Sequence, residues 1–330
     1  MPAARAATSK TQYRDILFEV KDQVAWITIN RPRVLNAFRE QSLDEMIDAL
    51  KSTREDPSIV CAVVTGAGDK SFSAGGDFYA MKRLNFTNAY MWNDRMLGLA
   101  MTIRGLPIPV IAMVNGWCMG GGHELALWCD LVIASENAVL GQTGAKVGAC
   151  PTVGATQYLP RIIGERLARE MIFCARRFSA REAAQIGLIN KCVPQKDLLA
   201  ETLKWCETMK GHSALTIRMT KRSLNFESDN LYSSWQHGME LLAHVWGSDE
   251  AKEGMNAFLE GRKPDFQRFR LRDKQELKRY MDGYYKDENA PPDMRARAGA
   301  AAVPPAVRTG TARRVVAAQA AKRGRKATRR

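Results

Sequence analysis

Two glycine-rich turns, each directly after a short apolar segment, constrain the fold of this chain more than any other feature. The first turn, residues 73–77 (Ser-Ala-Gly-Gly-Asp), follows an apolar segment at 60–65. The second, residues 116–124, follows an apolar segment at 109–115 and leads into another at 125–129. Glycine lets the backbone approach a ligand closely, and a helix N-terminus offers free N–H groups. Two such turns can direct two N–H groups at one oxygen atom, as in an oxyanion hole.

The second glycine-rich turn fits neither of the common nucleotide-binding motifs. It lacks the spacing of a dinucleotide-binding GxGxxG motif, and it lacks the GxxxxGK(S/T) pattern of a nucleotide phosphate loop. Each turn taken alone is also consistent with a purely structural role.

The first half of the chain alternates strand and helix patterns. Strands are expected at residues 60–65, 109–115 and 131–135, and residues 18–30 fit one strand or a hairpin. An amphipathic helix is expected at 41–52. This alternation indicates an α/β architecture with a largely buried sheet.

After about residue 164 the strand pattern fades. Helices are expected at residues 165–175, 180–186, 198–209 and 213–225. We therefore expect a helical layer attached to the α/β core. No internal repeat is evident.

The positive charge is concentrated at the C-terminal end. The formal net charge is +14, and residues 291–330 hold eleven basic residues and one acidic residue, which leaves +4 for the other 290 residues. An enzyme of nucleic acids would carry its basic patch on the folded part. The composition of residues 289–330, rich in Ala, Arg and Pro, is typical of a disordered tail, either solvated or in contact with a polyanion.

Cysteine, histidine and hydropathy patterns point to a cytoplasmic protein without a metal. The seven cysteines form no CxxC pair and are interpreted as reduced thiols, most of them buried. The four histidines form no HxH or HxxxH pair, so we expect no metal site. No segment approaches the roughly 20 apolar residues of a membrane helix, and the N-terminus lacks the apolar core of a secretory signal.

Several spaced motifs carry a resemblance to a known family. They are Asn30-Arg31-Pro32 with Asn36-Ala37, residues 73–77, residues 115–125 with Cys129-Asp130, and Gly141-Gln142 with Gly148, Pro151 and residues 154–157. In this order they resemble the crotonase (enoyl-CoA hydratase/isomerase) superfamily over residues 13–270.

The resemblance implies a fold and an assembly. The core, residues 13–200, would be an α/β spiral of ββα units, and a helical C-terminal region, 201–288, would drive assembly into a homotrimer or a dimer of trimers. Residues 1–12 would be a flexible N-terminus and 289–330 a separate basic tail. The substrate would be an acyl-CoA, with CoA arriving as part of the substrate and no further cofactor.

The resemblance also implies site residues. The backbone amides of Gly76 and Gly121 would stabilise the enolate oxygen of the thioester, and residues 30–39 would hold the CoA nucleotide. Lys82 and Arg83 would be phosphate contacts, while Trp92, Trp117 and Tyr79 would line an acyl pocket or belong to the core. The expected substrate-binding or CoA-binding residues are Arg33, Asn36, Ala37, Ser73, Ala74, Lys82, Tyr79, Trp117, Gly144 and Trp246.

The acid/base residues depart from the family pattern. Hydratases of the superfamily use two glutamates twenty residues apart; Glu124 occupies the first position, but the second is Gly144. Glu124 is therefore the predicted catalytic acid/base, with an exposed residue at a helix N-terminus as the alternative. His123 is an ambiguous candidate for a direct role, and Cys150 has no evident base partner.

A subgroup resemblance widens the choice of reaction. Residues 141–148, 253–258 and 262–266 look like dihydroxynaphthoyl-CoA synthase and its relatives that open 2-ketocyclohexanecarboxyl-CoA by hydrolysis. That subgroup has Ser and Asp where this chain has Ala149 and Pro151, a Tyr where it has Trp246, and no counterpart of Glu124.

Three hypotheses follow. The first is hydration of an enoyl-CoA, in the catabolism of a cyclic or aromatic-derived acyl-CoA. The second is ring-opening C–C hydrolysis of a cyclic β-ketoacyl-CoA. The third, from another class, is a catalytically weakened binding protein with a polyanion-binding tail.

Overall fold

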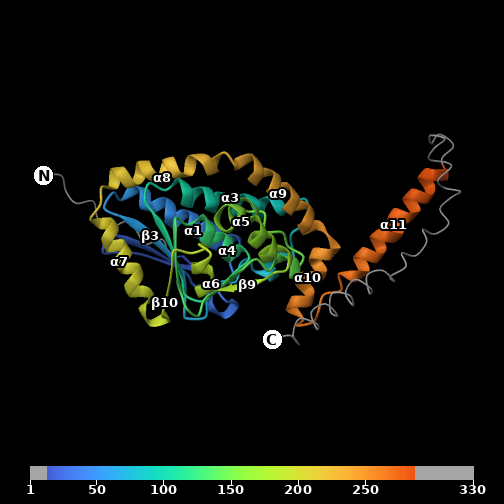
Figure 1. Ribbon diagram of the computed structural model, residues 1–330, viewed down its shortest axis with the longest axis horizontal. Helices are drawn as coiled ribbons and strands as arrows, with labels where there is room; N and C mark the ends of the chain where they lie inside the picture. The colour runs from blue at the N-terminus through green and yellow to red at the C-terminus, as the bar shows by residue number, and fades with distance from the viewer. Residues whose placement is uncertain (1–12, 287–330) are drawn as a thin grey trace, which may run out of the picture. The chain divides into compact units, whose positions relative to one another are not determined.

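The structure is a computed structural model that describes residues 13–286 (Figure 1). The expected flexible N-terminus, residues 1–12, and the expected basic tail, residues 289–330, lie outside the described part. Residues 13–266 form one compact unit. The last described helix, α11 (Gln267–Lys286), belongs to a second unit.

A six-stranded sheet organises the first unit. Its strand order is β1 (Ile16–Lys21), β2 (Val24–Ile29), β3 (Cys61–Gly66), β5 (Val110–Val114), β7 (Leu131–Ser135) and β10 (Lys191–Val193). β1 and β2 form an antiparallel hairpin, and the remaining neighbours are parallel. Asp22 and Gln23 both have positive φ, 51° and 64°, as a two-residue hairpin turn that follows strand twist requires. Strands were therefore correctly predicted at all four expected segments, the first as a hairpin.

The two faces of this sheet bury different cores. Ala62 and Val64 of β3 point into the larger core, which also holds side chains of helices α1 (Glu40–Ser52) and α3 (Ala89–Gly105). Cys61 and Val63 point to the opposite face, into a smaller core beneath helix α7 (Leu198–Lys210). Burial on both faces explains why this strand is a continuous apolar run rather than an alternating one.

A second sheet was not foreseen. It has four strands of three residues each, in the order β4 (Ser71–Ser73), β6 (Trp117–Met119), β8 (Val139–Gly141) and β9 (Arg177–Ser179). The glycine-rich turn expected at residues 73–77 includes the last residue of β4, and the expected loss of strands after residue 164 was wrong for β9 and β10. Strands this short hold too few residues to show a period of two.

The helical segments follow the predictions in part. Helices were expected at α1, α7, α6 (Ala180–Gln185) and α8 (Ala214–Asp229), and the structure confirms all four. Helix α5 (Ala155–Phe173) begins ten residues earlier than expected, with non-helical φ and ψ at Gly164.

Other helices were missed. They are α2 (Phe78–Met81) and α3, whereas α9 (Tyr232–Gly247) and α10 (Asp249–Leu259) lie within residues 201–288, which were expected to be helical without individual bounds. Buried residues lie around much of α3 because this helix packs on both α1 and α9 (Figure 1), which blurs its amphipathic pattern. Within the described part of the chain, every helix is too short or too polar to cross a bilayer.

Candidate active site

The two glycine-rich turns meet in space. Strands β4 and β6 are parallel neighbours, so the turns that follow them start from the same edge of the second sheet. Gly75 has a φ of 94°, and a Cβ added to it would lie 2.9 Å from the backbone nitrogen of Gly121 and 2.9 Å from the carbonyl oxygen of Met119. Only glycine fits at this point, because both the backbone angle and the close approach exclude a side chain.

Backbone hydrogen bonds fix the peptide groups of the first turn. The N–H of Phe38 donates to Gly75 O at 2.9 Å, and the N–H of Asp77 donates to Phe38 O at 2.8 Å. These bonds leave the intervening N–H of Gly76 unused. Gly121 is the first residue of helix α4 (Gly121–Trp128), so its N–H has no acceptor within the helix. Neither N–H has an acceptor within residues 13–286, and both glycines line one pocket.

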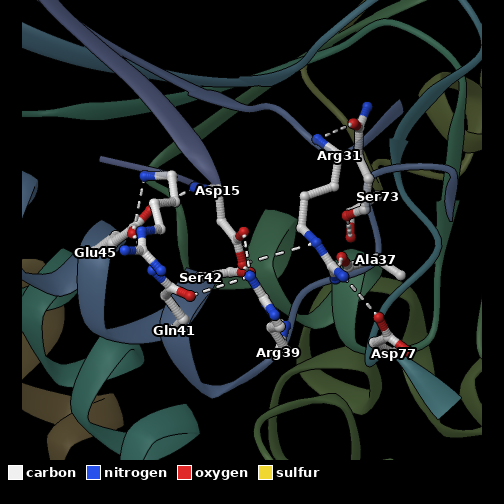
Figure 2. A network of polar contacts seen from close by, with 11 residues as sticks. Asp15, Arg31, Ala37, Arg39, Gln41, Ser42, Glu45, Ser73 and Asp77 are labelled. Carbon is white, nitrogen blue, oxygen red and sulfur yellow. Dashed lines mark hydrogen bonds and ion pairs between the residues drawn. The ribbon is translucent and has the colours of Figure 1, made fainter. Parts of the chain in front are cut away.

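An ion-pair network holds the first turn against residues 31–39 (Figure 2). Nη2 of Arg31 lies 2.8 Å from Oδ2 of Asp77, and Nη1 donates to Ala37 O at 2.5 Å. Asp77 also caps helix α2 by accepting the N–H of Tyr79. Because Asp77 directly follows Gly76, this network fixes one side of the Gly76 peptide.

The network continues to the start of β1. Arg39 donates from Nε and Nη2 to the two carboxylate oxygens of Asp15, at 2.8 and 2.9 Å. Burial alone would raise the pKa of Asp15, but hydrogen bonds from Arg39 and Ser42 hold it below its ordinary value. Asp15 is therefore ionised at neutral pH and ties residues 31–39 to the sheet (Figure 2).

A pocket opens beside the two turns. Together with its mouth it comprises about 440 Å³. It is lined by Phe38, Gly76, Met81, Trp92, Met96, Gly120, Gly121, Glu124, Gln142, Gly144, Ala149, Cys150, Pro151, Val153, Leu242 and Trp246. Both predicted oxyanion glycines, Glu124, Gly144, Trp92 and Trp246 are thus brought together. Helix α9 contributes Leu242 and Trp246 to the wall from the same chain.

Glu124 is buried, not exposed. It lies in the first turn of α4 with 5% relative exposure, so the alternative of a solvated residue at a helix N-terminus is wrong. Its Oε1 accepts the N–H of Val153 at 3.0 Å and that of Ala155 at 3.5 Å. Burial raises its pKa to about 8, although the two backbone N–H groups oppose the shift. With a pKa of about 8, both protonation states are accessible near neutral pH: the protonated form can donate a proton, and the ionised form can accept one.

Because residue 144 is a glycine and not a glutamate, the residues that line the pocket include one carboxyl group. The carbonyl oxygen of Gly144 accepts the N–H groups of Val147 and Ala149, both at 2.9 Å, and closes a tight turn. A Cβ on Gly144 would lie 2.5 Å from Ala149 O. A glutamate therefore cannot occupy this position unless the backbone moves. Glu124 is the only carboxylate among the residues that line the pocket.

Gln142 is a pocket residue that was not among the predicted site residues. Its Nε2 lies 3.1 Å from Nδ1 of His123 and donates to Gly120 O at 3.3 Å. His123 is 1% exposed, and burial lowers its pKa to about 4, so it is neutral. The location of Gln142 in the motif that begins at Gly141, two residues before Gly144, was the available signal.

The other predicted substrate residues lie away from this pocket. Arg33, Lys82, Arg83 and Tyr79 are exposed on the surface, with Lys82 Nζ 5.3 Å from the centroid of the Tyr79 ring. They are available only to a part of a ligand that extends out of the pocket.

The remaining predicted residues lie in the loops and in strands β4 and β6 of the second sheet, around the two turns. Asn36 and Ser73 are buried: Asn36 Nδ2 donates to Ser71 O, and Ser73 Oγ donates to Asn36 O. Ala37 is buried too, and Ala74 donates its N–H to Leu35 O. Trp117 is 37% exposed, with the Arg177 guanidinium over its ring.

Comparisons with known proteins agree on one family. Residues 19–269 match the profile described as Enoyl-CoA hydratase/isomerase. A crystal structure of an enoyl-CoA hydratase from Mycobacterium avium subsp. paratuberculosis is similar with 28% identity and a TM-score of 0.71, over 77% of this chain and 99% of that one. The enoyl-CoA hydratase from Bacillus anthracis has 32% identity and a TM-score of 0.63, over 77% and 99%. Carnitinyl-CoA hydratase from Mycobacterium avium has 31% identity and a TM-score of 0.69, over 78% and 99%.

Proposed function

Because the chain belongs to the enoyl-CoA hydratase/isomerase family, we propose that it is an enzyme that adds water to an enoyl-CoA thioester. The observation that carries the proposal is the juxtaposition of buried Glu124 with two free N–H groups, of Gly76 and Gly121, in one pocket. Several of the similar solved structures are hydratases of CoA thioesters, which supports the same reaction class.

The proposed chemistry assigns a role to each group. The thioester oxygen accepts hydrogen bonds from Gly76 and Gly121, which stabilise the enolate that forms as water attacks the β-carbon. Water loses one proton as its oxygen bonds to the β-carbon, and one proton is delivered to the α-carbon. Glu124 handles both transfers, because it is the only carboxyl group that lines the pocket.

The side chains that line the pocket favour a substrate with a bulky apolar acyl group. Phe38 stacks on Trp92 with ring centroids 6.2 Å apart, and Leu242 and Trp246 of α9 also line the pocket. Such a lining favours a cyclic or aromatic-derived acyl-CoA as the substrate.

A second reaction has a specific observation in its favour. The Gly144 turn has no room for a second carboxylate, and ring-opening hydrolysis of a cyclic β-ketoacyl-CoA needs one base. In that reaction hydroxide adds to the β-keto carbon, the bond between the α-carbon and β-carbon breaks, and the leaving enolate takes a proton at the α-carbon. Glu124 activates the water and returns the proton.

Exposed apolar side chains support the proposed assembly into a homotrimer or a dimer of trimers. Helix α8 carries Leu215, Met219, Leu224 and Phe226 with exposures of 48–74%. An apolar surface of this kind marks an interaction site. Light scattering on the purified protein measures the assembly, and a monomer at micromolar concentration would refute it.

One labelling experiment separates the proposed reactions. The protein is incubated in ¹⁸O-water with cyclohex-1-enecarbonyl-CoA and, separately, with 2-oxocyclohexanecarbonyl-CoA, and the products are fragmented by mass spectrometry. Label in an alcohol supports hydration, and label in a new carboxylate supports ring opening. Glu124→Gln should lower the rate of either reaction by roughly 10²–10⁴-fold. No label in either product, with wild type equal to Glu124→Gln, would favour a binding protein instead.

A further inference from the structure

The carbonyl oxygen of Gln142 is buried without a partner. Gln142 is 1% exposed and lines the pocket. Its Oε1 accepts no hydrogen bond from the described residues. A buried acceptor without a donor is unfavourable, and in a binding pocket it marks a place where a ligand or a water molecule supplies the missing donor.

The orientation of this amide is fixed by its two contacts. The nitrogen Nε2 lies 3.3 Å from Gly120 O, and a backbone carbonyl oxygen can only accept. The amide nitrogen, not the oxygen, must therefore face Gly120. The same nitrogen lies 3.1 Å from Nδ1 of His123, so neutral His123 accepts there and carries its proton on Nε2. Oε1 of Gln142 is left as the only free acceptor of the amide.

Gln142 and Glu124 share an anchor. The carbonyl oxygen of Gly120 accepts both Nε2 of Gln142 and the backbone N–H of Glu124, the latter at 3.0 Å. The backbone of Gly120 is held in turn by its N–H, which donates to Gly141 O at 2.9 Å. One carbonyl group, at the residue before α4, therefore holds both the side chain of Gln142 and the backbone of Glu124.

We propose that Gln142 accepts a hydrogen bond from the attacking water and so performs the orienting role of the absent second carboxylate, with His123 as its positioning residue. This inference rests on the proposed hydration. Gln142 gives and takes no proton: it accepts the O–H bond that the water retains. The other O–H bond breaks, its proton passes to Glu124, and Glu124 delivers one proton to the α-carbon. Glu124 ends in the protonation state in which it began.

Two variants of Gln142 test the role. Gln142→Met keeps the length of the side chain but removes the acceptor, and Gln142→Glu keeps an oxygen at the same place. With cyclohex-1-enecarbonyl-CoA as the probe, we expect Gln142→Met to lower kcat for hydration about 100-fold with KM changed less than threefold. Gln142→Glu should recover at least part of that loss.

A second readout separates a water-orienting role from a distorted pocket. Exchange of the α-protons of butanoyl-CoA with D₂O needs Glu124 and the two glycine amides but no attack by water. Gln142→Met should therefore exchange these protons at the wild-type rate. If Gln142→Met loses hydration rate and exchange rate equally, or if its hydration rate stays within twofold of wild type, the proposal is overturned. If wild type exchanges α-protons but hydrates no enoyl-CoA, the proposed hydration fails, and the role of Gln142 with it.

Variants of His123 test the positioning step. His123→Asn retains an acceptor near the place of Nδ1, whereas His123→Leu does not. We expect His123→Leu to lower kcat for hydration and not α-proton exchange, and His123→Asn to restore kcat. Equal activity of the two variants would remove His123 from the proposal.

A buried amide outside the pocket is the matched control. Asn115 is 4% exposed, donates from Nδ2 to Gly66 O and Gly68 O, and has an Oδ1 without a partner within residues 13–286. Asn115→Leu should lower the melting temperature, as loss of a buried amide does, while hydration per folded molecule stays at the wild-type level. A selective loss of hydration in Asn115→Leu would show that the Gln142 result is not specific.

Discussion

Oε1 of Glu124 accepts the backbone N–H of Val153 at 3.0 Å, which joins the first turn of α4 to the segment that leads into α5. This bond holds one carboxyl oxygen at the pocket wall. The opposing effects of burial and the backbone N–H groups leave the pKa of Glu124 at about 8, against an ordinary value of 4.5.

The raised pKa predicts how stability depends on pH. Between pH 4.5 and 8 the unfolded chain has released this proton while the folded protein retains it. Raising the pH through this range therefore favours the unfolded state, by at most about 1.4 kcal/mol per pH unit. Glu124→Gln removes this contribution. Urea unfolding at pH 5 and pH 8 should show that wild type loses more stability than Glu124→Gln. Parallel losses in the two proteins would mean that Glu124 is ionised in the folded state at neutral pH.

The contact between the two glycine turns predicts a selective effect of Gly75→Ala. Gly75 and Gly187 both have positive φ, 94° and 75°, so alanine is strained at either position by roughly 1–2 kcal/mol. A Cβ on Gly187 has no atom within 4 Å, whereas one on Gly75 approaches Gly121 N to 2.9 Å. We expect Gly187→Ala to lose stability only, and Gly75→Ala to lose stability and at least tenfold in kcat. The measurements are urea unfolding and hydration rates, and similar rates for the two variants would argue against an oxyanion role for the turns.

We expect removal of the largely buried ion pair between Arg31 and Asp77 to lower the free energy of unfolding more than removal of an exposed ion pair. The Arg31 side chain is 16% exposed and that of Asp77 is 9%, so Arg31→Met leaves a nearly buried carboxylate without its cation. We expect a loss of roughly 2–3 kcal/mol in the free energy of unfolding. Arg95, which pairs with Asp44 at 30% and 54% exposure, is the control, and Arg95→Met should cost less than about 1 kcal/mol. Equal costs would show that the network in Figure 2 does not hold the turn.

Long, strongly patterned segments could be predicted from the sequence, whereas short ones could not. The buried strand β3 and the amphipathic helix α1 have enough residues to show their periods. Strand β4 has three residues, and its pairing with β6 depends on contacts between segments 46 residues apart. Neither the hydrophobic periodicity of a segment nor its local secondary-structure propensity predicts a contact with a distant segment.

The candidate site, too, could be predicted from the sequence only in part. Gly76, Gly121 and Glu124 were selected because their spacing matches a family motif, and the structure brings all three to one pocket. Gln142 was missed because its significance depends on the unpartnered Oε1, and hydrogen bonding of one side chain cannot be read from sequence. The absence of a carboxylate at Gly144 was visible, but the contact with Ala149 O that excludes a side chain there was not.

That contact predicts the outcome of Gly144→Glu, which would place a glutamate at the expected second position. The new Cβ would lie 2.5 Å from Ala149 O, in a turn that Val147 and Ala149 close by hydrogen bonds to Gly144 O. Opening this turn displaces Ala149, Cys150 and Pro151, which line the pocket. We therefore expect Gly144→Glu to lower both the melting temperature and the hydration rate. Lys146→Glu, an exposed change in the same turn that also adds a carboxylate, should leave both nearly unchanged. A hydration rate above wild type in Gly144→Glu would show that the turn opens readily and that this site accepts a second carboxylate.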